Sequence, residues 1–168
     1  MKRLAVQDAN VLIDLWDIGL LELIFDLKLE VHSTDLVVNE IRQEEQVGAV
    51  QKLIDEGKLL VHAFTPKELA ELVAFQTGHS SLSLEDCSVW RIAGQLEAIL
   101  LTGDGALRKK AAAAGLEVHG SLWLLDELVN QSLIKLPDAC VALQGLMKKN
   151  PRLPQAACKD RIDQWCGK

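Results

Sequence analysis

Short apolar runs alternate along the chain with stretches in which hydrophobic residues recur every three or four positions. The apolar runs at residues 4–6 and 98–101, the alternating stretch at 58–64 and the short segments at 29–32 and 117–119 predict strands. The longer spacing predicts helices at residues 11–16, 20–27, 36–41, 47–55 and 68–75, from Ser83 onward, and at 105–114 and 121–129. Strands that alternate with helices are typical of a parallel sheet covered by helices on both faces.

Two more short helices are predicted after these elements, at residues 137–147 and 154–165. The segment between them, Asn-Pro-Arg-Leu-Pro, contains no linker-like composition, and the chain has no internal repeat. A length of 168 residues with 49% hydrophobic residues suits one domain with a proper core. We therefore expect a single domain over residues 1–168, with a core at about 4–130 and a C-terminal helical extension at about 137–166.

Composition and cysteine spacing narrow the class of protein further. No apolar run approaches the ~20 residues of a membrane span, and no signal peptide is visible, so we expect a cytoplasmic protein that does not bind membranes. The cysteines form no Cys-x-x-Cys pair and are expected to be reduced, mostly buried thiols: Cys87, Cys140, Cys158 and Cys166. The four histidines are dispersed, and we assign them no chemistry.

The net charge of −6 argues against a protein that coats nucleic acid by neutralising phosphates. The charge is unevenly distributed, however. Residues 148–168 carry +4, so residues 1–147 carry −10. The body of the protein is acidic, and its C-terminal segment is basic and faces either a substrate or water.

Acidic residues follow the predicted strands. Asp8 ends the first strand, and Asp104 follows the strand at 98–101, while Glu40 and Asp86 lie in early turns of helices. In open parallel sheets, ligands bind beyond the carboxyl ends of the strands, where Asp8 and Asp104 are expected. Taken singly, each acid has an ordinary explanation: helix capping for Asp8, Asp86 and Asp104, and a solvated helix position for Glu40. Taken together, clustered carboxylates repel one another unless a cation is present, which predicts Mg²⁺ or Mn²⁺.

Four motifs carry a resemblance to a known family. Asp-Ala-Asn-Val-Leu-Ile at 8–13, Val-Asn-Glu-Ile at 38–41, Leu-Ser-Leu-Glu-Asp at 82–86 and Leu-Thr-Gly-Asp-Gly-Ala-Leu-Arg at 101–108 resemble, in order, the motifs of PIN domain nucleases. Gly-Ser-Leu-Trp-Leu-Leu at 120–125 resembles the segment after the last strand in the prokaryotic, VapC-like toxin branch of that family. The resemblance covers roughly residues 4–130.

The resemblance implies an α/β fold, a three-layer αβα sandwich with a central, mostly parallel sheet of about five strands. It also implies a metal-dependent endoribonuclease that hydrolyses RNA phosphodiester bonds, as the toxin of a toxin–antitoxin pair. A small antitoxin protein is then an expected partner, and we expect a homodimer. Matching the motifs residue by residue gives the expected metal-binding and catalytic acids as Asp8, Glu40, Asp86 and Asp104, with Asn10 and Thr102 as supporting hydrogen-bonding groups.

The sequence leaves one metal ligand, the RNA contacts and the role of Trp90 open. Glu85 adjoins Asp86 and is an alternative metal ligand. Basic residues near the motifs are candidate RNA contacts, although a solvated basic helix face is the commoner explanation for such residues: Arg91, Arg108, Lys109 and Lys110. Trp90, four residues after Asp86, suits either a core position or a base-stacking position.

Two other functions compete with the ribonuclease. The first is a non-catalytic binding module that keeps the fold and is occupied by a protein partner. The second is a phosphohydrolase with Asp8 as a covalent nucleophile, which is disfavoured because the haloacid-dehalogenase-like pattern requires a second aspartate where Asn10 stands.

Overall fold

The computed structural model describes residues 1–167. Five parallel strands form one sheet in the order β3-β2-β1-β4-β5. The strands are β1 (Arg3–Gln7), β2 (Leu29–Thr34), β3 (Leu59–His62), β4 (Ile99–Leu101) and β5 (Val118–His119). The helices are α1 (Ala9–Asp17), the 3₁₀ helix η1 (Leu23–Asp26), α2 (Asp35–Glu40), α3 (Glu44–Asp55), α4 (Pro66–Thr77), α5 (Leu84–Leu96), α6 (Gly105–Ala113), α7 (Ser121–Asn130), α8 (Leu136–Lys149) and α9 (Gln155–Trp165). The sheet and its flanking helices confirm the predicted α/β fold.

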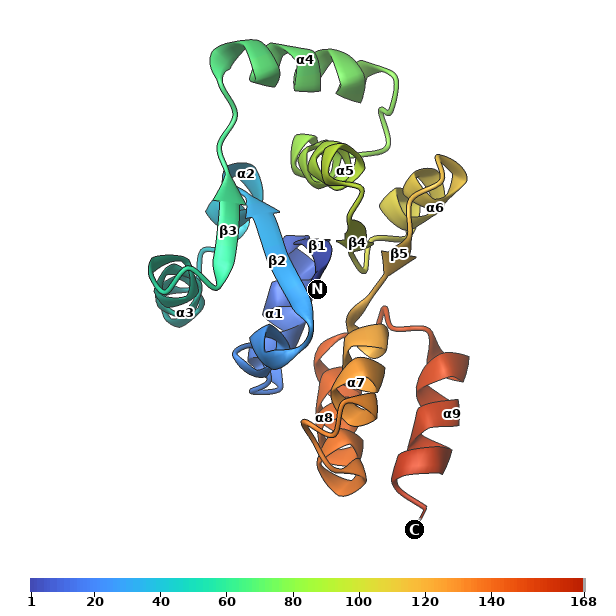
Figure 1. Cartoon of the computed structure of the whole chain (residues 1–168). Coiled ribbons are helices and arrows are strands. Elements are labelled where there is room, and N and C mark those ends of the chain that lie inside the picture. The colour runs from blue at the N-terminus through green and yellow to red at the C-terminus, as the bar shows by residue number, and fades with distance from the viewer. Residues whose placement is uncertain (168) are drawn as a thin grey trace.

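The helices lie on both faces of the sheet. Right-handed crossovers between parallel strands place α1 and α3 on one face and α5 and α6 on the other. Helix α5 packs across β1, β2 and β4, and α4 lies outside α5, away from the sheet (Figure 1). Helix α7 contacts α1 and therefore belongs to the α1 face. The strand order reverses between β1 and β4. In folds of this kind, ligands bind in the crevice at the carboxyl ends of the strands where the order reverses.

Local sequence signals define several helix starts. Asp8, Thr34 and Asp104 each accept a hydrogen bond from a backbone N–H of the helix that they precede. Thr65 and Ser83 form capping boxes with Glu68 and Asp86. Such a cap contributes about 1 kcal/mol to stability, so these polar residues fix where each strand exit turns into a helix.

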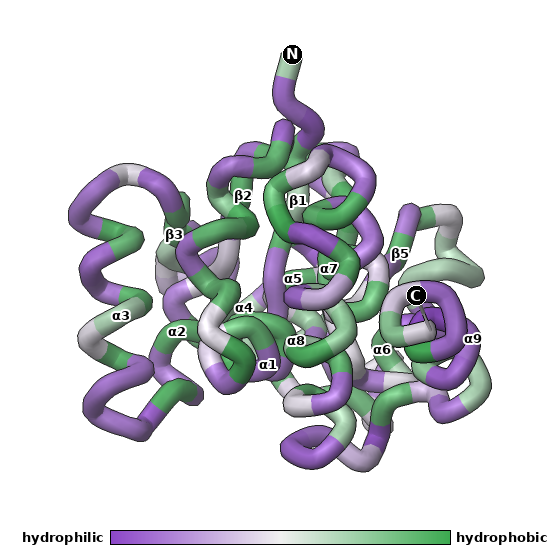
Figure 2. The backbone as a smooth tube through the Cα atoms, turned by 90° about the horizontal axis from the view of Figure 1, so that it is seen from below, coloured by the Kyte–Doolittle hydropathy of each residue, from purple (hydrophilic) through white to green (hydrophobic). Residues whose placement is uncertain are grey.

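The C-terminal helices form a layer of their own beside the sheet. Helix α8 packs against α1 and α7, and α9 packs against α8 (Figure 1). Figure 2 shows α3 and α9 at opposite sides of the molecule, with many of their residues hydrophilic. Leu143 and Leu146 of α8 and Trp165 of α9 are buried, so the extension adds to the hydrophobic core.

The prediction that all four cysteines are reduced thiols is wrong for two of them. Cys140 on α8 and Cys166 after α9 form a disulfide, with their Cα atoms 5.3 Å apart. Cys87 and Cys158 are free and buried, as predicted. The pair was missed because its cysteines are 26 residues apart and meet only through the packing of α9 on α8.

The helix predicted over residues 20–27 is also wrong, because only the short helix η1 forms there. The buried residues Leu21, Ile24 and Leu27 recur at intervals of three. A spacing of three suits the 3₁₀ helix, which has three residues per turn, better than the α-helix. Gly19, with φ of +72°, forms the turn between α1 and this segment.

Within residues 1–167, none of the helices combines the length and the apolar character that a bilayer crossing requires.

Candidate functional site

The candidate site lies where β1 and β4 end side by side. The backbone N–H of Asp8 donates to the carbonyl of Leu101 at 2.9 Å, which joins the two strand exits. The Asp8 side chain is 3% exposed. Its Oδ1 accepts a hydrogen bond from the Ala9 N–H, and its Oδ2 accepts one from the Thr102 hydroxyl, both at 2.8 Å. Asp8 is therefore held by residues of both strand exits.

The environment of Asp8 opposes its ionisation. Burial, with smaller contributions from the negative charges of Asp86 and Asp104, raises the pKa of Asp8 to about 6. The hydrogen bonds from Thr102 and the Ala9 N–H act in the opposite direction and limit the rise. A buried carboxylate with acidic neighbours is costly unless a positive charge joins it.

Asn10 and Thr102 connect Asp8 to the loop that carries Asp104. The Asn10 amide donates to Asp8 Oδ2 at 3.3 Å and accepts the Gly103 N–H at 2.9 Å. The Thr102 hydroxyl accepts the Asp104 N–H at 3.1 Å while it donates to Asp8. Asp104 Oδ1 in turn accepts the Leu107 N–H at 2.8 Å, as the cap of α6. One continuous hydrogen-bond network thus fixes the two strand-end acids relative to each other.

Asp86 approaches the pair from α5. Its Oδ2 accepts the Ser83 N–H at 2.9 Å, and its own N–H donates to the Ser83 hydroxyl at 3.0 Å, which forms the capping box. Burial, together with repulsion from Asp104 and Glu85, raises the pKa of Asp86. The capping explanation and the acid-cluster explanation for Asp86 are therefore compatible.

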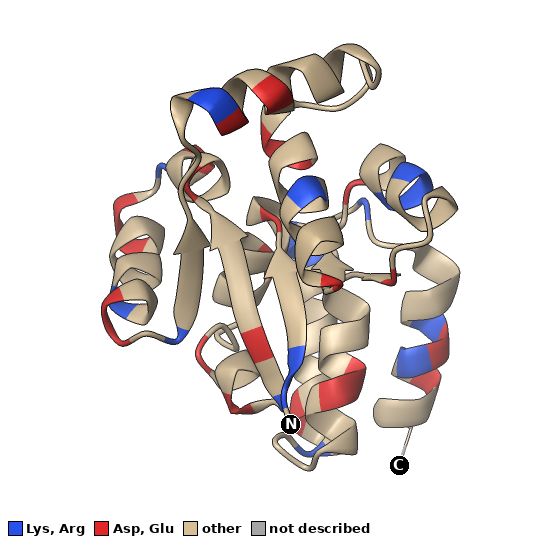
Figure 3. Cartoon of the chain, turned by 45° about the horizontal axis from the view of Figure 1, so that its top comes forward, with Lys and Arg blue, Asp and Glu red and all other residues tan. Residues whose placement is uncertain are grey.

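Glu40 is the fourth acid, at the last residue of α2. Partial desolvation and the negative charges of Asp8, Glu85 and Asp86 raise the pKa of Glu40 to about 7. The hydroxyl of Thr34, which caps α2, hydrogen-bonds the hydroxyl of Ser88 at 2.8 Å and ties α2 to α5. The four predicted acids thus share one region, and acidic ribbon segments lie near the carboxyl ends of the central strands (Figure 3).

The donor set of this region fits a hard divalent cation in its chemistry, because such ions bind carboxylate oxygens. Within residues 1–167, however, no three Asp, Glu, His or Cys side chains stand close enough together to hold one metal ion as they are. Asp86 and Asp104 both use a carboxylate oxygen to cap their own helices. Each of these oxygens retains a second lone pair, which is available to a cation.

A cleft of about 820 Å³ adjoins the acids on the side of Asp104. Arg108 lines it and donates to the Thr102 carbonyl at 3.1 Å. Of the other predicted RNA contacts, Arg91 pairs with Glu71 of α4 at 3.6 Å, and Lys109 is exposed on α6 without lining the cleft. Sequence reasoning missed four further lining residues, although it noted the basic charge of the segment that carries two of them: His119, Trp123, Lys149 and Arg152.

The remaining aromatic and histidine residues have structural roles. Trp90 is 8% exposed and packs edge-on against Phe75, which supports the core position and not base stacking. The ring nitrogens of His32 and His62 lie 2.9 Å apart across β2 and β3. Desolvation and the neighbouring His32 lower the pKa of His62, so His62 favours its neutral form.

Solved structures of low sequence identity align with this chain. PAE2754 from Pyrobaculum aerophilum aligns with a TM-score of 0.52 and 17% identity, over 74% of this chain and 89% of that one. A domain of a functionally unknown protein from Methanocaldococcus jannaschii aligns with a TM-score of 0.46 and 22% identity, over 70% and 90%. At this identity, the likeness to PAE2754 shows the fold alone. No curated protein matches the chain.

A family match extends over the core and the C-terminal helices. Residues 4–166 match the family described as a PIN domain. PIN domains are generally nucleases, and the acids at the carboxyl ends of β1 and β4 agree with such a fold. The match also reaches beyond residues 4–130, where the motif resemblance ended, to include α8 and α9. The chain therefore belongs to the PIN domain family.

Proposed function

We propose that this protein is a Mg²⁺- or Mn²⁺-dependent endoribonuclease of the VapC-like toxin type. The observation that supports the proposal best is the network of hydrogen bonds that joins Asp8 and Asp104 at the ends of β1 and β4, close to Asp86 and Glu40. Burial, with a smaller contribution from the mutual repulsion of these acids, raises the pKa values of Asp8 and Glu40 to about 6 and about 7. A site that concentrates negative charge at the ligand edge of a parallel sheet is suited to a divalent cation.

Each residue of the site has a proposed role. Asp8, Glu40, Asp86 and Asp104 hold the ion, with Glu85 as the alternative to Asp86. Asn10 and Thr102 orient Asp8 and the Asp104 loop through their hydrogen bonds. The bound ion supplies an activated water and stabilises charge on the phosphate under attack. Arg108, beside Asp104, is placed to neutralise a neighbouring phosphate of the RNA.

The residue at position 10 argues against the phosphohydrolase alternative. That pattern requires a second aspartate, whereas the Asn10 amide donates to Asp8 Oδ2 and accepts the Gly103 N–H. The toxin role, an antitoxin partner and a homodimer rest on the motif resemblance and are part of this proposal.

The test is a metal titration with a labelled RNA substrate. The wild type should cut RNA in Mg²⁺ or Mn²⁺ and lose cutting in EDTA, and Asp104→Asn should reduce cleavage about 100-fold or more, because a metal ligand is lost. Asp138→Asn, an exposed acid in the first turn of α8, is the matched control and should cut normally. Full activity in EDTA would refute metal dependence, and a partner-bound protein with no turnover in any metal would favour the binding module.

Cleavage should also rise with pH across the acidic to neutral range. Because carboxylates bind a cation only when deprotonated, a raised pKa makes metal binding weak below that pKa and strong above it. With pKa values of about 6 for Asp8 and about 7 for Glu40, activity at fixed Mn²⁺ should increase as pH rises through 6 and 7.

Glu40→Gln isolates the upper part of this profile. It removes the group with the pKa of about 7, so the midpoint of the pH profile should move to lower pH. Glu44→Gln, an exposed acid at the start of α3, should leave the midpoint in place. Equal midpoints for the wild type and Glu40→Gln would exclude Glu40 from the site.

A further inference from the structure

The cleft beside Asp104 is lined by four parts of the chain that are distant in sequence. They are the start of α1, the loop at 103–105 with Arg108, the segment from the end of β5 into α7, and the α8–α9 connection at 149–154 with the first half of α9. Its volume of about 820 Å³ lies within the range of binding sites for small organic groups, about 300–1,000 Å³. The acids and the cleft therefore share a border at Asp104.

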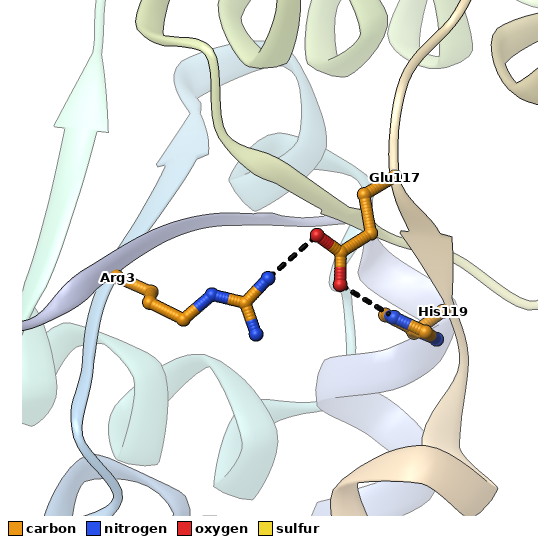
Figure 4. Close-up of polar contacts among 3 residues, drawn as sticks. All are labelled: Arg3, Glu117 and His119. Atoms are coloured by element: carbon orange, nitrogen blue, oxygen red, sulfur yellow. Dashed lines mark hydrogen bonds and ion pairs between the residues drawn. The ribbon is translucent and has the colours of Figure 1, made fainter.

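A pair of stacked rings lies in this cleft. The rings of His119 and Trp123 are nearly parallel, at 8°, with centroids 4.4 Å apart, and both side chains are half-buried. Glu117 accepts a hydrogen bond from His119 Nε2 at 2.8 Å and pairs with Arg3 across the sheet (Figure 4). The His119 ring is thus linked through Glu117 to Arg3 of β1. The stacked pair presents a flat aromatic surface on which a further ring can stack.

The position of the α8–α9 connection is fixed by a buried carboxylate. Asp14 of α1 is 7% exposed and accepts hydrogen bonds from the Ser121 hydroxyl at 2.8 Å and from the Asn150 amide at 3.1 Å. The Asn150 side chain also accepts the Arg152 N–H at 3.0 Å. The basic wall of the cleft is therefore preformed.

The cations of the cleft differ in how far they are already paired. Arg161 forms a two-point ion pair with Asp126, with Arg161 Nε 2.8 Å from Asp126 Oδ1. Lys149 and Arg152 are exposed, and neither forms an ion pair with any acid in residues 1–167. Two available cations that line the same cleft as an aromatic stack match the phosphates and bases of an unpaired nucleic acid strand, whose bases have flat faces on both sides.

We propose that this cleft binds the single-stranded RNA segment next to the scissile phosphate, with a base stacked on the His119–Trp123 pair and phosphates on Lys149 and Arg152. The proposal deepens the proposed ribonuclease function and rests on it for the identity of the strand. The C-terminal extension then binds substrate, although it carries none of the proposed metal ligands.

The experiment measures binding without cleavage, by fluorescence anisotropy of a labelled oligoribonucleotide in EDTA. A second oligonucleotide of equal length lacks the bases and keeps the phosphates. Trp123→Ala should weaken binding of the base-containing strand about tenfold and leave the abasic strand nearly unchanged. Trp16→Ala, an exposed tryptophan on α1 outside the cleft, is the matched control and should affect neither strand.

A second variant tests the phosphate contacts without touching a packed ring. Lys149→Glu/Arg152→Glu should weaken binding of both strands about tenfold and reduce the salt dependence of binding. Lys28→Glu/Lys67→Glu changes the net charge equally at exposed positions outside the cleft and should have a much smaller effect.

Three results would overturn the assignment. The wild type and Trp123→Ala would bind the base-containing strand equally, or the two charge variants would be indistinguishable, or polyglutamate would displace the oligonucleotide as well as unlabelled RNA does. The outcome is separable from that of the ribonuclease proposal. A wild type that binds as described but cuts no RNA in Mn²⁺ contradicts the ribonuclease alone, and a wild type that cuts while Trp123→Ala binds normally contradicts the cleft alone.

Discussion

Asp8→Asn is expected to abolish RNA cleavage and at the same time to stabilise the fold. Cleavage should fall about 100-fold or more because the variant loses a metal-binding carboxylate. The gain in stability follows from the raised pKa of Asp8. An ordinary value of 3.8 for Asp8 rises to about 6 in the folded protein, so folding favours the protonated form.

The direction of the effect depends on pH. Because the folded protein holds the Asp8 proton more tightly than the unfolded chain, the associated stability is fully present below about pH 4 and is lost as pH rises through 6. At pH 7.5 the wild type therefore carries the whole cost of a buried charge. Asparagine removes that charge, but its amide nitrogen cannot accept the hydrogen bonds that Asp8 Oδ2 accepts from Thr102 and Asn10, which leaves an expected net gain of about 1–2 kcal/mol.

Thermal unfolding in EDTA and in Mn²⁺ checks this expectation. The melting temperature of Asp8→Asn in EDTA should exceed that of the wild type by about 3–6 °C at pH 7.5, and the difference should shrink at pH 4.5. Mn²⁺ should raise the melting temperature of the wild type only. Asp138→Asn should melt like the wild type throughout. A destabilised Asp8→Asn that still responds to Mn²⁺ would place the cation elsewhere.

Reduction of the Cys140–Cys166 disulfide should lower the free energy of unfolding by about 3 kcal/mol, the expected contribution of a cross-link over such a loop. The bond closes a loop with a sequence separation of 26 between α8 and α9, so its main effect is to restrict the unfolded chain. Urea unfolding with and without a phosphine reductant measures the change.

Cys140→Ser/Cys166→Ser is the control for that measurement. The double variant should be as unstable as the reduced wild type and should not respond to the reductant. Cys87 and Cys158 stay as free thiols in both proteins, so their chemistry cancels in the comparison. A wild type whose urea midpoint is the same in both conditions would show that the disulfide does not form in solution.

The parts of the fold that the sequence predicted are those set by local signals. The sequence pattern predicted all five strands, and the clearest apolar run became β4, which is fully buried between the helical layers. Asp8 and Asp104 were placed correctly at the strand exits because each lies within three residues of the end of its strand and caps the helix after it. Their roles in catalysis stay a prediction, as do those of Glu40 and Asp86.

What sequence reasoning missed depends on contacts between distant residues. The disulfide joins two helices whose packing no spacing rule describes. The cleft brings Arg108, His119 and Arg152 together from α6, β5 and the α8–α9 connection. From the sequence alone, the basic C-terminal segment is compatible with facing either substrate or water. Its position relative to Asp104 depends on the tertiary packing of the helices that carry it.

Asp14 has a consequence for how the two parts of this chain depend on each other. Burial raises the pKa of Asp14, and hydrogen bonds from Ser121 and Asn150 offset that cost. A chain cut after residue 130 would lose Asn150 and expose the apolar face that α1 presents to α8. The predicted core at 4–130 would then keep a half-satisfied carboxylate beside a bare hydrophobic surface. Asp14 and the C-terminal extension are therefore expected to occur together. A shortened relative that lacks the extension should carry an apolar residue at the position of Asp14.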